Sequence, residues 1–446
     1  MGTATYSLKG KYVFSATARS DGSNRFGQYS NAKFLPNYGL SGRWDVSSEK
    51  WLETSRLISG LVLRGSYGSQ GNVVDAVGPE LIASYPSTGA INPITGFPFL
   101  NIKSLPYPSL RWEKTHQVNL GMDLALFDRR VSINTDFYYK RSRDLIMART
   151  IAAEYGITTM YKNEGRLVNK GIELTLNVDI VRQKNFNIGM TFINSRNINK
   201  IGDNQFSNDY QSYFTGNANV PGKAISGFYS YKFAGLSPEN GLPLFDNVDK
   251  SKDPVVEDPT TWLVYSGQLQ PVMNGSFSIN ARYKQLSFYS TFAYAFGSHK
   301  RLDPLFLNKT NDGVPPPFGN ANRALLDRWR KPGDEAHTNI PALVDQTAAQ
   351  AYGKLLDNPY SAYTRSDIRA VRNDFLRCPS MNLSYTCPPA VIKRLGVKGL
   401  SGGLSVSQVF TIASKALNGQ DPETDGVGTT ALPIARQYNF NLTLSL

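Results

Sequence analysis

The chain has 446 residues, and its 48 lysines and arginines against 35 aspartates and glutamates give a formal net charge of +13. That length allows two or three ordinary domains or one large closed sheet, and the absence of any run of about 18 apolar residues excludes a helical membrane span. The basic residues are scattered and lie near no nucleic-acid-binding motif, so anionic lipid head groups, an anionic substrate or an acidic partner are better candidates for their use than nucleic acid.

The first twenty residues contain neither the basic segment nor the apolar segment of a secretory signal. For an exported protein, this pattern indicates either that a leader was removed or that the chain is one piece of a larger assembly.

Two strands and a tight turn are predicted over residues 116–140. Apolar residues occupy every second position from Val118 to Leu126, and the same alternation continues over residues 131–139 after a short DRR turn. Because successive side chains of a strand point to opposite faces, each run has one apolar and one polar face. The short connection predicts a hairpin.

The same alternation recurs over residues 171–180, 275–296 and 438–446. Asp123, Asp136 and Glu173 lie in the middle of polar faces, where lumen water would solvate them. The apolar faces run for about ten residues, which is close to the length that crosses a bilayer at a tilt and longer than usual sandwich strands. The sequence therefore predicts an all-β protein with a transmembrane antiparallel β-barrel.

Long polar stretches alternate with short turns, which gives each strand a direction. The turns lie at 127–130, 181–185 and 284–285, and the long stretches lie near 71–108, 143–168, 199–222, 248–270, 298–370 and 412–433. In outer-membrane barrels the turns are periplasmic and the long loops external. Residues 229–237 and 276–283 would then both run inward, so we expect an outward strand at 242–248 and about 14 strands in total.

No catalytic or metal-binding motif is recognisable. The histidines His116, His299 and His337 have no neighbouring ligand, and the sequence contains no phosphate loop, no GxSxG and no HExxH. Asp123 and Asp136 could be posed as a glycosidase pair, but repeated polar residues on one face need no such explanation. We therefore predict no enzyme activity, no cofactor and no metal site.

Two further sequence features carry no chemistry. The stretch DPETDG at 421–426 has the spacing of half a calcium loop but lacks the glutamate at the twelfth position, where Leu432 stands. Cys378 and Cys387 lie on one predicted strand, roughly 30 Å apart, which is beyond disulfide reach.

Several long stretches carry a resemblance to a known family. They are ARSDGSNRFG at 18–27, LVLRGSYGSQGN at 61–72, NEGRLVNKGIELTLN at 163–177 and DRWRKPGDEAHTNIPAL at 327–343. In sequence and order they resemble the C-terminal barrel portion of SusC/RagA-type TonB-dependent transporters of the Bacteroidetes outer membrane, over essentially the whole chain.

The resemblance implies a multi-pass outer-membrane barrel of about 22 strands closed by an N-terminal plug. It also implies a SusD-like surface lipoprotein, energy from TonB–ExbB–ExbD through the plug portion, and import of oligosaccharides or peptides. Lipid and lipopolysaccharide would surround the barrel. We expect residues 1–446 to be the C-terminal part of that barrel, with the plug-bearing portion in a separate chain or a missing segment.

The external loops are the expected contact surface for substrate or partner. The candidates are Asp21, Ser23 and Arg25 in the first loop and Trp329, Arg330 and Asp334 in the longest, with Trp329 suited to stack on sugar. For each of them, internal loop packing is the competing explanation.

Two other functions stay open, a self-contained passive porin of about 14 strands and a secreted β-rich carbohydrate-binding protein. We also expect the final strand to close the barrel, with Tyr438 and Phe440 read by the insertion machinery because Leu446 is not aromatic.

Overall fold

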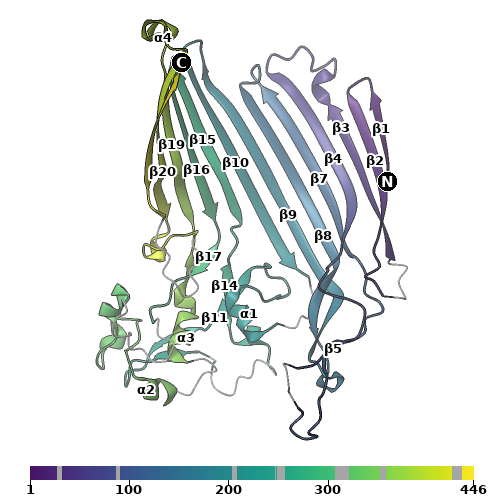
Figure 1. Ribbon diagram of the computed structural model, residues 1–446, viewed down its shortest axis with the longest axis vertical. Coiled ribbons are helices and arrows are strands. Elements are labelled where there is room, and N and C mark those ends of the chain that lie inside the picture. The colour runs from purple at the N-terminus through teal and green to yellow at the C-terminus, as the bar shows by residue number, and fades with distance from the viewer. Residues whose placement is uncertain are drawn as a thin grey trace. The chain divides into compact units, whose positions relative to one another are not determined.

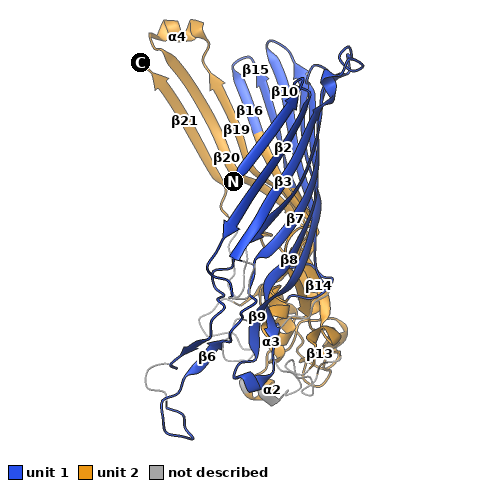
Figure 2. Ribbon diagram, turned by 90° about the vertical axis from the view of Figure 1, so that its right-hand side faces the viewer, with its two compact units in different colours: residues 1–208, 219–225, 275–289 blue, residues 209–218, 226–274, 290–446 orange. Residues whose placement is uncertain are grey.

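The computed structural model describes residues 1–27, 33–86, 91–202, 208–246, 248, 257–306, 321–351, 358–423 and 434–446. The chain divides into two compact units, which are coloured separately in Figure 2. Unit 1 comprises residues 1–208, 219–225 and 275–289, and unit 2 comprises residues 209–218, 226–274 and 290–446.

In the described part of the chain, the main element is an antiparallel sheet of thirteen strands, paired in the order in which they follow one another along the chain (Figure 1). Its strands are β1 (Gly2–Leu8), β2 (Tyr12–Gly22), β3 (Phe34–Asp45), β4 (Ile58–Asn72), β7 (Glu113–Leu126), β8 (Val131–Thr150), β9 (Thr159–Arg182), β10 (Phe186–Ile201), β15 (Met273–Tyr283), β16 (Leu286–Phe296), β19 (Phe375–Thr386), β20 (Gly399–Ala413) and β21 (Gln437–Ser445).

The remaining elements are short. The paired strands are β5 (Ile82–Ser84) with β6 (Asn101–Ser104), β11 (Gly227–Ser230) with β14 (Val264–Gln268), β12 (Phe233–Leu236) with β13 (Pro243–Phe245), and β17 (His299–Arg301) with β18 (Ala370–Arg372). The α-helices are α1 (Tyr210–Thr215), α2 (Gln346–Ala351), α3 (Pro359–Thr364) and α4 (Pro389–Leu395). The 3₁₀ helices are η2 (Val46–Ser48), η3 (Ala153–Tyr155), η4 (Pro259–Thr261), η5 (Arg323–Asp327), η6 (Asp334–Ala336), η7 (Asp367–Arg369) and η8 (Lys415–Leu417). Within the described residues, every helix is too short or too polar to cross a membrane.

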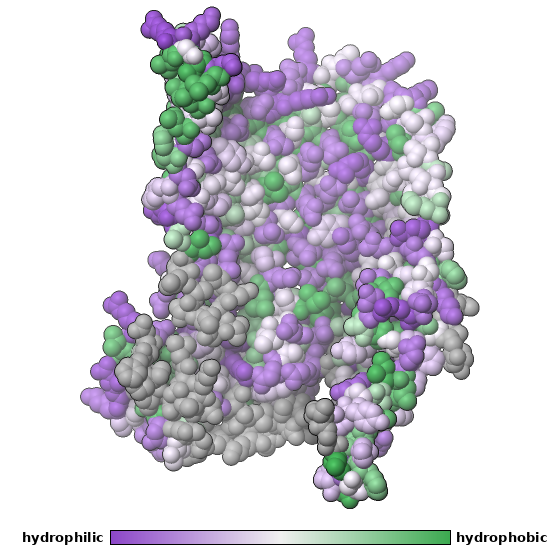
Figure 3. All heavy atoms as spheres, viewed as in Figure 1, coloured by the Kyte–Doolittle hydropathy of each residue, from purple (hydrophilic) through white to green (hydrophobic). Residues whose placement is uncertain are grey.

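The alternation predicted from the sequence sets the two faces of the strands in unit 1. Leu120 on β7 lies opposite Phe137 on β8, which lies opposite Ile172 on β9, so the three side chains share one face. Leu120 and Phe137 are 59% and 54% exposed, as suits a face in contact with hydrocarbon. On the face of the molecule shown in Figure 3, hydrophilic side chains predominate over the middle strands.

Short turns join the strands at one end and long connections join them at the other. In unit 1 the turns at 127–130 and 183–185 lie at the top of Figure 1. Phe127, Asp128 and Arg129 adopt left-handed backbone conformations, which closes the β7–β8 turn within four residues. At the other end β8 and β9 continue for 20 and 24 residues and support the long connections.

The prediction of two wall strands between 229 and 248 is wrong. β12 and β13 pair with each other, and β11 pairs with β14, in sheets separate from the main one. The main sheet has thirteen strands within the described residues, close to the predicted number of about 14. The stretches predicted as separate loops at 199–222 and 248–270 belong to one connection between β10 and β15.

The connections in unit 2 have hydrophobic cores of their own. Three clusters of buried residues centre on Trp329, Tyr360 and Tyr363 and include Leu236, Leu242, Leu305, Leu325, Ala342 and Ala349. Burial of this kind stabilises long loops as packed structure.

Candidate functional site

An ion-pair cluster lies on the polar face of β4, β7 and β8 in unit 1. The Arg64 guanidinium donates to both carboxylate oxygens of Asp123 at 3.0 and 2.9 Å and to both of Asp136 at 3.2 and 3.1 Å. Gly121 makes room for it, because a Cβ there would lie 2.7 Å from Arg64 Cζ. Two carboxylates and one guanidinium give this patch a formal charge of −1. Their shared partner supports an ordinary polar-face role for both carboxylates.

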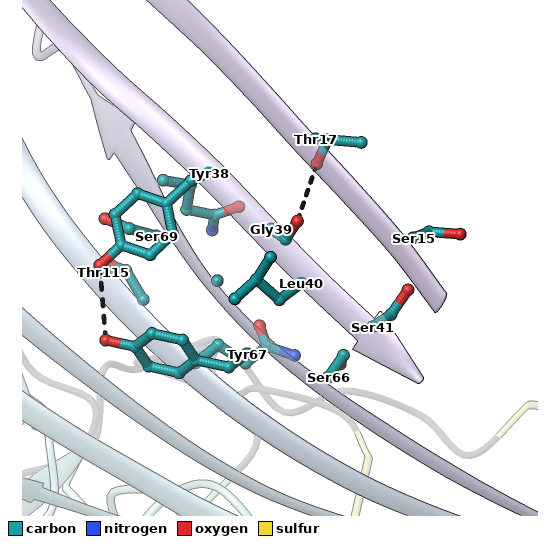
Figure 4. Close-up of a pocket in the computed structure, with 13 residues that line it drawn as sticks. Ser15, Thr17, Tyr38, Gly39, Leu40, Ser41, Ser66, Tyr67, Ser69 and Thr115 are labelled. Carbon is teal, nitrogen blue, oxygen red and sulfur yellow. Dashed lines mark hydrogen bonds between the residues drawn. The ribbon is translucent and has the colours of Figure 1, made fainter. Parts of the chain in front are cut away.

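A hollow of about 290 Å³ lies over β2, β3, β4 and β7 (Figure 4). Small residues form it because Gly39 lies opposite both Thr17 and Gly68 in the strand register. A Cβ on Gly68 would lie only 3.0 Å from the Tyr38 carbonyl oxygen. Its polar lining consists of Ser15, Thr17, Ser41, Ser66, Ser69, Gln70, Thr115, Gln117 and the hydroxyl groups of Tyr38 and Tyr67, and Leu40 adds an apolar side chain. The hollow thus presents neutral hydroxyl and amide groups, which suit a polar uncharged cargo.

The predicted contact residues of the first loop hold that loop in place. The Asp21 carboxylate accepts a hydrogen bond of 2.6 Å from Asn37 Nδ2, and Ser23 Oγ accepts one of 3.2 Å from the Arg25 backbone N–H. Arg25 Nη1 donates to the Asp75 carbonyl oxygen at 2.7 Å, which ties the first loop to the connection between β4 and β7. The Arg25 side chain is 51% exposed and remains accessible.

Trp329 lies in the core of unit 2. Its ring is 8% exposed and packs against Leu236 and Ala342, and its Nε1 donates to Glu335 Oε2 at 3.0 Å. A Cβ on Gly241 would lie 2.3 Å from the ring, so a glycine is needed there. Stacking of a sugar on Trp329 does not fit this arrangement, because both faces of a buried ring are already in contact with protein.

Arg330 and Asp334 form a turn beside Trp329. One Asp334 carboxylate oxygen accepts hydrogen bonds from the backbone N–H groups of Arg330 at 3.0 Å and Lys331 at 3.1 Å. These bonds, the one from Arg330 foremost, lower the pKa of Asp334 below its ordinary value. Of the six predicted contact residues, three belong to unit 1 and three to unit 2, and the contact role of all six stays a prediction.

Arg301 is a half-buried cation that sequence reasoning missed. It donates to the carbonyl oxygens of Thr364 and Ser366, each at 3.3 Å, and to Tyr229 at 3.0 Å. Burial, together with the positive charges of Arg365 and Arg369, lowers the pKa of Arg301 to about 9. Its partners lie 63 to 72 residues away in sequence, so no local motif could have revealed it.

A buried arginine, Arg377, accounts for the acidic residues near position 421. Arg377 Nη2 lies 2.7 and 2.8 Å from the two carboxylate oxygens of Asp421, and Arg377 Nε lies 2.8 Å from Glu423 Oε2. These two acids of DPETDG are therefore partners of a protein cation. Residues 424–426 and Leu432 lie outside the described residues.

The histidines and cysteines stand apart from one another. His116 lies on β7, His299 on β17 and His337 just after η6, and Cys378 and Cys387 are free thiols. In the part of the chain that the structure describes, no group of three histidine, cysteine or carboxylate side chains is placed to hold a metal ion.

The model of one protein family matches most of the chain. That family is described as TonB dependent receptor-like, beta-barrel, and the match covers residues 1–370.

Curated proteins and a solved structure give the same similarity. TonB-dependent receptor P3 of Formosa agariphila is 24% identical, over 95% of this chain and 42% of its own length. TonB-dependent receptor SusC of Bacteroides thetaiotaomicron is 27% identical, over 100% of this chain and 43% of its own length. The structure of the RagAB peptide transporter has the same fold, with a TM-score of 0.75 and 24% identity over 100% of this chain and 47% of that one. The chain therefore spans less than half the length of each.

Proposed function

Because this chain belongs to the TonB dependent receptor-like β-barrel family of the bacterial outer membrane, we propose that it forms the larger part of the wall of an active importer. The polar face would line the path of the cargo, the apolar face would meet lipid, and the long connections would stand outside the cell. In this role the chain makes and breaks no covalent bond.

The odd number of strands in the main sheet carries this proposal. β1 runs into the short turn at 9–11, and β21 returns from the long connection at 414–436, so both edge strands run in the same direction. Neighbouring strands of an antiparallel barrel run in opposite directions, so β1 and β21 could pair with each other only as an unfavourable parallel pair. Closure needs an odd number of further strands, and a barrel of about 22 would supply about nine.

Edge strands are costly in a membrane. Tyr438, Phe440 and Leu442 on β21 are 67%, 74% and 65% exposed, so this edge strand presents an apolar face suited to lipid. Each unpaired backbone N–H or C=O group in hydrocarbon costs several kcal/mol. We infer that strands of the plug-bearing portion pair with β1 and β21. A passive porin closed by this chain alone would contain an unfavourable parallel pair at the seam.

The cargo that we propose is a polar oligomer, either a peptide or a glycan. The neutral hydroxyl and amide groups of the hollow and the weakly negative Arg64 cluster suit such a molecule. The name of one similar structure, the RagAB peptide transporter, supports the peptide class. A SusD-like lipoprotein would cover the long connections, and TonB–ExbB–ExbD would act through the plug.

The test is to extract the chain from its native outer membrane in mild detergent and to identify everything that accompanies it by intact-mass and peptide analysis. We expect a plug-bearing polypeptide, either separate or continuous with this sequence, and a lipoprotein. Small molecules released on denaturation of the same sample would identify the cargo as peptide or glycan.

Recovery of a lone, heat-modifiable barrel of 49.3 kDa would overturn the proposal. In that case the chain closes on itself, and discrete conductance steps from the purified chain in a planar bilayer would establish the passive porin instead.

A further inference from the structure

Four basic side chains interrupt the apolar face of unit 1, one on each of four neighbouring strands. They are Lys114 on β7, Arg141 on β8, Lys170 on β9 and Arg196 on β10. We call this set the cationic diagonal.

The strand register places all four on the apolar face. Arg196 lies opposite Ile172, and the next member, Lys170, is two positions nearer the long connections. Lys170 lies opposite Tyr139, from which Arg141 is again displaced by two positions in the same direction. Arg141 lies opposite His116, and Lys114 is two positions from His116, again toward the long connections. Since barrel strands are tilted by about 35–45°, a diagonal of this sense runs closer to the membrane plane than a register row does.

On the turn side, the neighbours of Arg141 and Lys170 on this face are the apolar side chains Tyr139 and Ile172, whereas those of Lys114 and Arg196 are His116 and Asn194. A groove of about 520 Å³ combines both kinds of surface, because Lys170 and Arg196 line it together with apolar neighbours. Those neighbours are Val118, Leu120, Phe137, Tyr139, Ile172 and Ile198. Cationic groups directly beside an apolar groove match an amphiphile with a negative head group.

The structure supplies no carboxylate for the cationic diagonal. Among the described residues, the nearby acids Asp144 and Glu164 are paired with Arg111 and Arg149, and none of the four basic side chains forms an ion pair. Arg141, Lys170 and Arg196 are exposed. Diagonal neighbours on adjacent strands lie about 7–8 Å apart, so these like charges repel one another unless an external anion lies between them.

The cationic diagonal begins at β7. In the register row of Arg141, the residues on β2, β3 and β4 are Ala18, Tyr38 and Ser69, none of which is charged. On the apolar face, the positive charge is therefore found on β7 to β10 and not on β2 to β4. This distribution indicates a local site rather than a belt of charge around the whole barrel.

We propose that the cationic diagonal and the groove beside it bind one lipopolysaccharide in the outer leaflet, with its phosphates on the four basic groups and its acyl chains in the groove. The proposal rests on the outer-membrane location of the family and not on the cargo or on the partner chains. Lipopolysaccharide fits better than an acidic protein, because the apolar side chains beside the diagonal face lipid.

The test is native mass spectrometry of the detergent-extracted protein, with all its accompanying subunits, in the presence of added lipid A. The variant carries K114Q, R141Q, K170Q and R196Q. The matched control carries R129Q, R182Q, K184Q and R282Q, which remove the same number of charges from exposed positions at the turn end. Dephosphorylated lipid A and phosphatidylcholine are the comparison lipids.

We expect the variant to bind lipid A at least about tenfold more weakly, while the control stays within about twofold of the parent and the parent prefers phosphorylated lipid A. Equal binding by parent and variant, or equal losses in variant and control, would overturn the proposal. So would a variant that keeps its lipid A but loses an accompanying protein. Heat-modifiability checks that each barrel is folded. If the fourfold variant does not insert into the membrane, the double variant R141Q with K170Q replaces it in the test, and we expect a smaller loss of lipid A binding. The variant R141K keeps the positive charge and should retain lipid A binding.

Discussion

A buried and a half-buried arginine of unit 2, Arg377 and Arg301, are accommodated in different ways. Arg377 is 6% exposed and meets the carboxylate of Asp421, which is 8% exposed. Arg301 instead donates to backbone carbonyl oxygens, including those of Thr364 and Tyr229. Removal of one member of a buried ion pair leaves an uncompensated charge, whereas a guanidinium held by carbonyl groups leaves only unpaired acceptors.

We expect Arg377→Gln to weaken the local structure around residues 415–423 by about 3 kcal/mol, because Asp421 would stay buried without its cation. Hydrogen exchange of the amides in that segment measures the effect. Arg372→Ala is the matched control, since the Arg372 side chain is 68% exposed in its pair with Asp374 and should contribute at most about 1 kcal/mol. Equal protection in both variants would contradict this reading.

His299 makes the stability of unit 2 depend on pH. Burial and the neighbouring Arg372 lower the pKa of His299 from 6.5, and Asp374 opposes this shift. The unfolded chain then takes up a proton at a higher pH than the folded chain, so stability falls as pH drops through about 6.5.

We expect amide protection in β17 and β18, corrected for intrinsic exchange, to fall between about pH 7.5 and pH 5.5, and His299→Gln to reduce that fall. His337→Gln serves as the control because His337 is exposed in the same unit. A pH dependence that is unchanged in His299→Gln would show that another group is responsible.

At the scale of elements, the sequence predicted the strands wherever one face of a strand meets lipid and the other is polar. The runs at 118–126, 131–139, 172–180 and 438–446 alternate because one side chain faces lipid and the next faces the polar side, and the structure has strands at all of them. The alternation also predicted where the short turns lie and that Asp123 and Asp136 belong to a polar face.

The stretch from 229 to 248 shows where that reasoning ends. Its apolar residues pack into a loop core, and its backbone is held by distant partners, as when Tyr231 exchanges hydrogen bonds with Arg365 and Asp367. Short buried strands and short lipid-facing strands have similar compositions, and contacts across more than a hundred residues leave no local pattern. The burial of Trp329 was unpredictable for the same reason.

The last strand gives a prediction about assembly. Phe440 lies on the apolar face of β21, opposite Leu404, whereas Asn441 lies on the other face, opposite Gly403. A charge on the lipid face, together with the lost aromatic side chain, costs on the order of 2 kcal/mol. We expect Phe440→Asp to lower the outer-membrane level of the protein several-fold and Asn441→Asp to leave it nearly unchanged, as measured by quantitative blotting of membrane fractions. Normal levels of Phe440→Asp would contradict the assignment of this face to lipid.

At the scale of the whole molecule, the thirteen strands form a wall that antiparallel pairing alone cannot close, because its two edge strands run in the same direction. An antiparallel sheet with an odd number of strands has parallel edges, so it favours a partner sheet that also has an odd number of strands. The strand count therefore bears on assembly more directly than any single residue does.

We expect residues 1–446, produced without any other polypeptide and refolded in detergent, to give no heat-modifiable band and no channel. Addition of the plug-bearing portion should restore a band that resists denaturant in the cold. Stable conductance from the lone chain would contradict the argument from the odd number of strands.

The length of β9 has a consequence for the route of the cargo. Its 24 residues extend about 80 Å, and at a tilt near 45° they rise about 55 Å, against about 30 Å of hydrocarbon. In the importer that we propose, much of that rise would stand outside the bilayer, in the carbohydrate layer of the outer leaflet. The wall would then screen a descending nutrient from the surrounding sugar chains until it is level with the bilayer.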